Sequence, residues 1–182
     1  MRKEQSSSFI MARGAAILVA LFAATAPAQA AVTLKDIQVA GRVIGFIDPA
    51  PSGTLKLGIV YDPSNAASTA DEQALAKILG DGFTVSGLTL VPEPVPIANV
   101  SHTDVDMLFL TGGLGSPGAA AGKVASTRKI LCVTTDLAAT RAGICAVAVQ
   151  SSPEVQIILN RAALSASGIS FDSAFMLLVT EI

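Results

Sequence analysis

Residues 106–118 read Asp-Met-Leu-Phe-Leu-Thr-Gly-Gly-Leu-Gly-Ser-Pro-Gly, an apolar run that stops at a cluster of glycines. The run has the length of a buried strand. The glycines are typical of a tight turn, and the Ala-rich segment up to residue 127 predicts a helix. A continuously apolar strand is buried on both faces of its sheet. This stretch therefore predicts an α/β fold built on a parallel sheet.

The alternation of strand and helix extends in both directions from this stretch. Upstream, the pattern predicts a helix over 33–47, a strand over 55–61, a helix over 68–80 capped by Ser68 or Thr69, and a strand over 84–91 before the proline-rich stretch 92–96. Downstream, it predicts a strand over 130–135, an antiparallel hairpin of 143–150 and 155–160, and helices near 161–167 and 171–181. We expect a single three-layer sandwich, flavodoxin-like in outline, with a mostly parallel sheet and the hairpin at one edge.

Residues 1–30 have the features of a secretory signal peptide. Arg2, Lys3 and Arg13 precede the apolar run 15–24, and Ala28-Gln29-Ala30 supplies the small residues that a signal peptidase accepts. The run is shorter than the roughly 20 residues that span a bilayer, and an uncleaved membrane anchor is the alternative interpretation. Translation begins at Met1 or at Met11. We expect a periplasmic protein whose single domain covers 31–182.

Charge and composition exclude some classes of partner. The chain has 12 Lys and Arg against 14 Asp and Glu, and the leader holds three of the bases and one of the acids, which leaves nine against thirteen. No basic patch is present, so we expect neither nucleic acid nor an anionic membrane surface as a partner. No second apolar segment is long enough to cross a membrane, so the cleaved chain should not be membrane-embedded. The oligomeric state stays open.

Two cysteines in an exported chain raise the question of a disulfide. Cys132 and Cys145 both lie in strand-like segments, and a bridge between them would close a loop of about 13 residues, which contributes on the order of 3 kcal/mol. Two buried free thiols on neighbouring strands are the alternative. The oxidising compartment favours the bridge. A zinc site is not expected, because two cysteines and one distant histidine do not supply four ligands.

Two motifs suggest catalysis or cofactor binding, and each has a simpler explanation. Gly113, Gly115 and Gly118 form a G-x-G-x-x-G pattern like that of dinucleotide-binding proteins, but a tight strand-to-helix turn explains it as well. His102, between Ser101 and Asp104, fits a turn better than a catalytic triad, whose members converge from separate elements. We therefore expect no catalytic site and no cofactor.

The carboxyl ends of the predicted parallel strands define a candidate ligand rim. Ligands of open α/β sheets collect at this edge. The residues that follow the three strands are polar or lack side chains, and they are Asp62, Ser64, Asn65, Thr111, Gly112, Gly113, Thr135 and Asp136. Asp62 and Asp136 equally suit N-caps of the following helices, so both interpretations stay open here.

The C-terminal half resembles the YfiR family of periplasmic regulatory proteins. The similarity covers about 130–182 and rests on Thr134-Thr135-Asp136, Arg141-Ala-Gly143, Val155-Gln-Ile-Ile-Leu-Asn160, Arg161-Ala-Ala163, Ala166-Ser-Gly168-Ile169-Ser170 and Met176-Leu-Leu178. Phe46-Ile-Asp-Pro49 is also similar to a Phe-x-x-Trp-Pro element, with Asp48 in place of the aromatic residue. The resemblance implies a non-catalytic exported protein that binds and restrains the periplasmic part of a membrane signalling protein, often a diguanylate cyclase.

The first half resembles a different class of exported protein. Leu57-Gly-Ile-Val-Tyr-Asp-Pro-Ser-Asn-Ala66 is similar to the strand, turn and helix that open a lobe in the substrate-binding proteins of ABC transporters. Those proteins clamp a ligand between two lobes, and this chain has the length of one. This second resemblance implies a single-lobe solute-binding protein with a small-molecule pocket at the rim. The regulator hypothesis predicts instead an exposed apolar patch for a protein contact.

Overall fold

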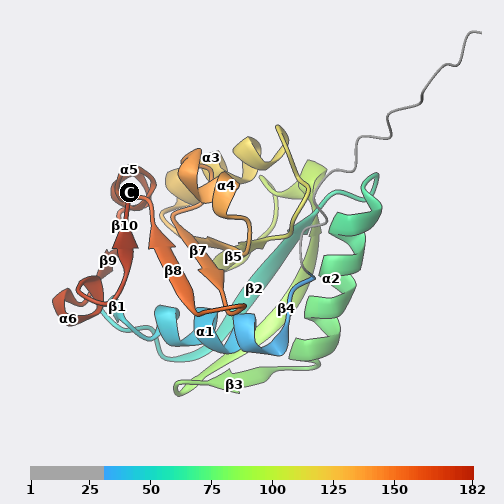
Figure 1. Cartoon of the computed structure of the whole chain (residues 1–182). Helices are drawn as coiled ribbons and strands as arrows, with labels where there is room; N and C mark the ends of the chain where they lie inside the picture. Colours follow the sequence, from blue (N-terminus) through green and yellow to red (C-terminus); the bar gives the residue numbers. More distant parts are fainter. Residues whose placement is uncertain (1–30) are drawn as a thin grey trace, which may run out of the picture.

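The computed structural model describes residues 31–182 and arranges them in three layers (Figure 1). Within these residues, an eight-stranded sheet has the order β3-β4-β2-β5-β6-β7-β8-β10. Its strands are β2 (Gly53–Tyr61), β3 (Phe83–Val85), β4 (Leu88–Pro96), β5 (Met107–Leu110), β6 (Leu131–Thr134), β7 (Val147–Gln150), β8 (Gln156–Leu159) and β10 (Thr180–Glu181). A second small sheet pairs β1 (Ile47–Asp48) with β9 (Ser170–Phe171). The predicted signal peptide, residues 1–30, lies outside the described residues.

The neighbouring strands β4, β2, β5, β6 and β7 all run parallel. Counted along the chain, their order in the sheet is 2-1-3-4-5, the flavodoxin-like order. The β8 strand returns antiparallel to β7, and β10 adds two residues outside β8. The predicted α/β sandwich, its mostly parallel sheet and its antiparallel hairpin are therefore confirmed, with the hairpin one short strand in from the edge.

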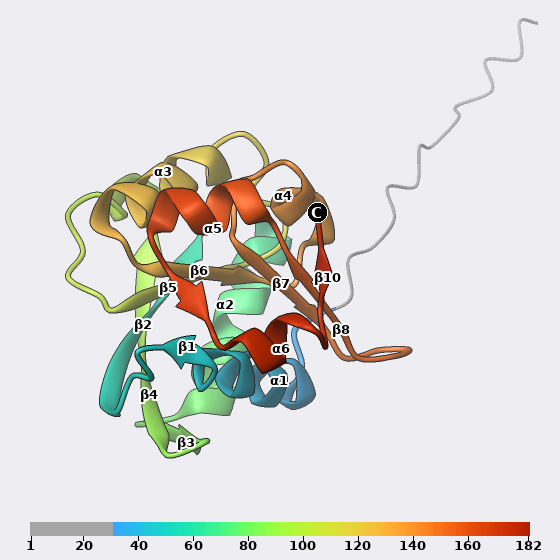
Figure 2. The same ribbon diagram turned by 90° about the vertical axis from the view of Figure 1, so that its left-hand side faces the viewer.

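Helices cover both faces of this sheet. They are α1 (Leu34–Ile44), α2 (Ala66–Leu79), α3 (Gly118–Arg128), α4 (Leu137–Arg141), α5 (Arg161–Ser167) and α6 (Ser173–Met176), with a 3-10 turn at Ile97–Asn99. Successive residues of β5 point to opposite faces, so Phe109 packs in the cluster under α1 and α2 while Leu108 and Leu110 pack under α3. Figure 2 shows α3, α4 and α5 above the sheet and α1 and α6 below it. In the part of the chain from 31 to 182, no helix combines the length and apolar character that a membrane span needs.

The helix caps explain where α1 and α2 begin. Thr33 and Asp36 form a reciprocal capping box at the start of α1. The α2 helix begins two residues before the predicted start and is capped by Asn65, whose Oδ1 accepts hydrogen bonds from the amides of Ala67 and Ser68. The prediction of Ser68 or Thr69 as the cap is wrong, because Asn65 satisfies the first amides earlier in the chain.

The predicted strand over 84–91 is a hairpin of β3 and β4. The two strands are joined by Ser86 and Gly87, both with positive φ (51° and 80°), as a two-residue hairpin turn requires. The β4 strand then continues through Pro92, Pro94 and Pro96, which sequence analysis placed outside a strand. Proline lacks an amide hydrogen, so it is tolerated in a strand only where that donor would face an open edge. β3 pairs only with residues 88–90, which leaves this side of β4 open beyond that point.

The predicted helix over 171–181 is largely wrong. The C-terminal segment forms β9, the single-turn helix α6 and β10. The Phe175 ring stacks on Phe46 with centroids 4.7 Å apart and packs against Phe171 at 5.1 Å. Contacts with residues far away in the sequence therefore decide the conformation of this segment, and its local periodicity does not.

Cys132 and Cys145 form a disulfide bond. Cys132 lies in β6 and Cys145 shortly before the neighbouring β7, with Cα atoms 5.0 Å apart and both residues buried. The pair sits in the apolar cluster under α3. The bridge, rather than two free thiols, is thus confirmed.

Replacing both cysteines by alanine should lower the free energy of unfolding by about 3 kcal/mol, because the bridge closes a loop with a sequence separation of 13. Urea denaturation under oxidising conditions measures the loss. Dithiothreitol should destabilise the parent protein to a similar extent and leave the double variant unchanged. A loss below about 1 kcal/mol would show that the bridge is a minor constraint.

Candidate functional site

The predicted rim residues gather at one end of the sheet. The β2 and β5 strands are neighbours, with Val60 opposite Leu110, and Leu110 lies opposite Thr134 of β6. The segments that follow these strands, 62–65, 111–113 and 135–136, therefore leave the same edge. Their individual contacts decide whether they form one site.

Between β2 and β5 the rim is closed by the chain's own side chains. The Asn65 Nδ2 donates a 2.9 Å hydrogen bond to the carbonyl oxygen of Gly113. The Ser68 and Thr111 hydroxyl oxygens are 2.7 Å apart, and the Thr111 hydroxyl donates to the carbonyl of Val60. Since the Thr111 hydrogen is used there, the Ser68 hydroxyl donates to Thr111. These contacts link β2, the segment that follows it and α2 to the segment after β5.

A buried carboxylate completes this closure. Asp71, on α2, accepts a 3.1 Å hydrogen bond from the amide of Gly112, and both residues are buried. Sequence analysis did not include Asp71 among the candidate rim residues. Its spacing of three residues from Ser68 places both on one face of α2, and that signal could have grouped them.

The G-x-G-x-x-G pattern forms the turn between β5 and α3. Gly113 has φ 74°, and a Cβ atom at this position would lie 2.9 Å from Asn65 Nδ2, so a larger residue would displace the Asn65 amide. Gly115 also has positive φ, and Gly118 is the first residue of α3. The positive φ and the close approach are those expected for a tight strand-to-helix turn.

The exposed side of the rim is formed by Asp62 and Ser64. Both the hydroxyl and the amide of Ser64 donate to Asp62 Oδ1, at 2.6 Å and 2.8 Å. The hydroxyl first, and then the amide, lower the pKa of the Asp62 carboxyl below its ordinary value. Asp62 does not cap α2, because Asn65 does.

At the end of β6, Asp136 is the N-cap of α4. Its Oδ1 accepts from the amides of Ala138 and Ala139, at 2.8 Å and 3.2 Å, which confirms the capping interpretation. One carboxylate oxygen serves the helix, and the side chain is half-buried. Thr135 points elsewhere, into a hollow of about 70 Å³ that it shares with Thr33 and Gln150.

A cavity of about 220 Å³ lies beside Asp136. It lies between the turn after β5 and the start of α4. The closed part of the rim lies between β2 and β5, whereas this cavity lies between β5 and β6. Its lining is mainly apolar or backbone, and consists of Leu110, Thr111, Leu114, Gly115, Gly118, Asp136, Ala138, Ala139 and Ile144. Of the predicted rim residues, Thr111 and Asp136 reach this cavity. Sequence analysis missed Leu114, Gly115 and Ile144, which come from loops.

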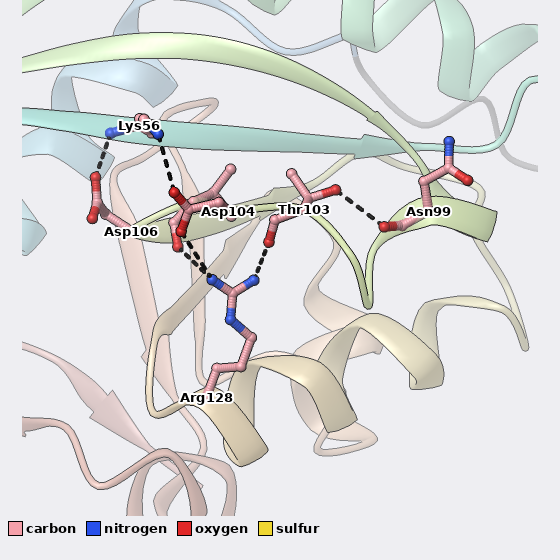
Figure 3. Close-up of polar contacts among 7 residues, drawn as sticks. Lys56, Asn99, Thr103, Asp104, Asp106 and Arg128 are labelled. Atoms are coloured by element: carbon pink, nitrogen blue, oxygen red, sulfur yellow. Dashed lines mark hydrogen bonds and ion pairs between the residues drawn. The ribbon is translucent and has the colours of Figure 1, made fainter.

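A charged cluster lies at the opposite end of the strands (Figure 3). Asp104 faces both Lys56 and Arg128, at 3.3 Å and 3.8 Å, and Arg128 also donates to the backbone carbonyls of Thr103 and Val105. Asp104 is 92% exposed, so these ion pairs contribute little energy individually. The hydrogen bonds of Arg128 link the segment before β5 to α3, and the ion pair of Asp104 with Lys56 links it to β2.

The remaining catalytic candidate does not assemble. His102 is exposed, and its Nδ1 lies 3.0 Å from the hydroxyl of the adjacent Ser101 in a turn, while Asp104 faces Lys56 and Arg128. Among residues 31–182, no three His, Cys, Asp or Glu side chains are arranged to hold a metal ion.

Comparison with known proteins gives structural neighbours only. No family model and no curated protein matches the sequence. The fold is similar to the ligand-free, open structure of CD0873, a substrate-binding protein with adhesive properties from Clostridium difficile, at 14% identity and a TM-score of 0.59 over 81% of this chain and 58% of that one.

Two further solved structures have the same fold. A conserved domain protein from Vibrio cholerae has 12% identity and a TM-score of 0.54 over 81% of this chain and 59% of that one. The ABC domain from Streptococcus pneumoniae in complex with L-Trp has 13% identity and a TM-score of 0.54 over 80% and 60%. The chain thus spans about three fifths of each neighbour. At 12–14% identity these neighbours share the fold alone with this chain, and none of them supports the YfiR resemblance.

Changing Asn65 separates its two roles. Asn65→Ala should cost about 2 kcal/mol of unfolding free energy, from one lost helix cap and one lost hydrogen bond to Gly113. Asn65→Asp keeps a capping oxygen and loses only the donor, so it should cost about 1 kcal/mol. Chemical denaturation compares the three proteins. Equal costs for both variants would contradict the bond to Gly113.

Proposed function

We propose that this protein is an exported, non-catalytic binding protein that takes a small solute in the cavity beside Asp136. The observation that carries the proposal is the position of this cavity. It lies at the carboxyl ends of β5 and β6, where open α/β sheets bind their ligands. Its volume of about 220 Å³ is smaller than typical drug-sized sites, so a small solute fits it.

The structural neighbours support a binding role. One is a substrate-binding protein and another is a complex with L-Trp. At 12–14% identity they share the fold alone with this chain. The cavity therefore carries the proposal, and the neighbours are consistent with it. Export is inferred from the leader sequence and is consistent with the Cys132–Cys145 disulfide.

The cavity lining indicates the chemistry of the solute. Leu110, Leu114 and Ile144 supply an apolar wall. Asp136 supplies a carboxylate with one oxygen held by α4 and the other not used by the cap. We therefore propose a solute that combines a short apolar group with a positively charged nitrogen.

Asp136→Asn tests this proposal without removing the helix cap, because asparagine caps as well as aspartate. Thermal shift with 3-methylbutylamine should show stabilisation of the parent protein, which approaches about 2.7 kcal/mol at 100 times the dissociation constant. The neutral isostere 3-methylbutanol should bind more weakly. In the Asp136→Asn variant, the preference for the amine should disappear.

Asp172→Asn is the matched control, since Asp172 caps α6 in the same way and lies outside the cavity lining. This variant should respond like the parent protein. Stabilisation that is absent for both probes, or that is equal in Asp136→Asn and Asp172→Asn, would contradict a carboxylate-dependent site.

A second candidate function is an adaptor for a membrane signalling protein. A separate observation favours it, because several large apolar side chains of the β7–β8 hairpin and of the C-terminal segment are exposed. Leu177 is 87% exposed, Leu178 76% and Val155 52%. Val155 and Leu178 line one common groove, and contiguous exposed apolar surface of this kind marks protein contacts. A diguanylate cyclase-type partner is the version of this function that the YfiR resemblance implies.

Affinity capture from solubilised membranes tests the adaptor function. The protein should retain a membrane signalling protein, identified by mass spectrometry, and Leu178→Ser should release it. Capture is run with and without reductant, because the disulfide is confirmed. Recovery of no signalling protein under either condition would eliminate this candidate and leave the solute-binding proposal untouched.

A further inference from the structure

An apolar groove of about 330 Å³ runs along α1 on the face opposite the disulfide. One bank is α1, and the other combines the β8 hairpin with the C-terminal segment, which Figure 2 shows beside α1. Its lining residues are Lys35, Gln38, Val39, Arg42, Val43, Phe46, Val155, Ile157, Phe175 and Leu178. The groove shares no residue with the cavity beside Asp136.

The floor of the groove is well ordered by packing. Phe175 is only 2% exposed and stacks on Phe46, which is itself 40% exposed. Val39 and Val43 are buried along the adjacent face of α1. The groove therefore has a fixed apolar base, and its banks carry apolar side chains that remain open to solvent, Phe46, Val155 and Leu178.

The charge of the groove is opposite to that of the chain. Residues 31–182 have an excess of acids, yet the lining contains Lys35 and Arg42 and no Asp or Glu. Both cations are on α1, seven residues apart, which corresponds to about 10 Å along the helix axis. The Lys35 ammonium donates to the carbonyl of Ser151, which holds it at the groove's edge.

We propose that this groove docks an amphipathic helix of a partner protein, with apolar residues facing Phe46, Phe175 and Leu178 and carboxylates facing Lys35 and Arg42. The inference rests on the second candidate function and adds the place and the chemistry of the contact. A helix in an apolar groove is a common mode of recognition, read as anchors at i, i+3 or i+4, and i+7. Acidic side chains seven residues apart match the spacing of the two cations.

Other occupants fit the groove less well. A second copy of the chain, docked on the same face by two-fold symmetry, would bring the same cations into one interface without acids to balance them. A membrane surface is attracted by about 1 kcal/mol per basic residue, and two cations on a chain with excess acid give little attraction. A concave groove also suits a projecting helix better than a lipid surface.

The test uses a fluorescent 18-residue helical peptide with leucines on one face and glutamates on both flanks. Binding to the purified protein is measured by anisotropy, beside a matched peptide with every glutamate replaced by glutamine. The glutamate peptide should bind at least tenfold more tightly. Arg42→Glu should lose at least tenfold for the glutamate peptide and regain binding for a lysine version of the same peptide.

Two matched variants control for charge and for hydrophobicity. Lys77→Glu reverses an exposed cation on α2 and should bind like the parent protein. Leu178→Ser should weaken binding at least tenfold, whereas Leu177→Ser, more exposed but outside the groove lining, should not. Unchanged thermal unfolding of each variant shows that the fold is retained.

Several results would overturn the proposal. These are equal binding of the glutamate and glutamine peptides, no binding of either, or the same affinity for Arg42→Glu and Lys77→Glu. A dimer that Leu178→Ser dissociates in sedimentation would assign the groove to a second copy. Flotation with phosphatidylglycerol vesicles that Leu178→Ser abolishes would assign it to a membrane. The peptide assay contains no signalling protein, so its result does not depend on the membrane capture. If the peptide binds in the groove but the capture recovers no signalling protein, only the signalling partner is excluded.

Discussion

The hydrogen bond between the buried Asp71 carboxylate and the amide of Gly112 fixes the relation of α2 to the turn after β5. A buried carboxylate needs such partners, and a hydrogen bond to a charged group contributes about 1.5–3 kcal/mol. The contacts from Ser68 to Thr111 and from Asn65 to Gly113 reinforce it along the same seam. Together they fill the crevice between β2 and β5, where the strand order reverses and where this fold ordinarily binds its ligand.

Closure of that crevice explains the position of the proposed solute site. With the space between β2 and β5 occupied by its own polar groups, the open cavity lies one strand further, between the turn after β5 and α4. Asp136 lines this cavity. Its Oδ1 caps α4, and its other carboxylate oxygen is not used by the cap. The groove on α1 is carried by the opposite layer, so the two proposed contacts use different faces of one rigid sheet.

Much of the fold could be predicted from sequence because it depends on local pattern. The continuous apolar runs at 55–61, 106–111 and 130–135 are strands because only a covered parallel sheet buries both of their sides. The prolines of β4 gave the opposite signal, since their tolerance depends on an open sheet edge that sequence does not show. The C-terminal segment was missed because the Phe46–Phe175 contact joins residues far apart in the chain.

The location of the candidate rim could be predicted from the sequence, but the contacts between its side chains could not. Strand ends indicate where Asn65, Gly113 and Asp136 lie, whereas the partnership of Asp71 with Gly112 depends on how α2 packs against β5. The cavity was missed for the same reason, since its apolar wall comes from Leu114 and Ile144 in separate loops. The spacing of Ser68 and Asp71 indicates a shared face of α2, but it does not identify Thr111 and Gly112 as their partners.

Amide hydrogen exchange at Gly112 tests the closed crevice most directly, and it needs no ligand. If the Asp71 carboxylate holds this amide in the folded protein, Gly112 should exchange as slowly as the amides of β5, through openings close to global unfolding. Exchange as fast as that of the exposed Gly115 would contradict the account, because the crevice between β2 and β5 would then be open to solvent.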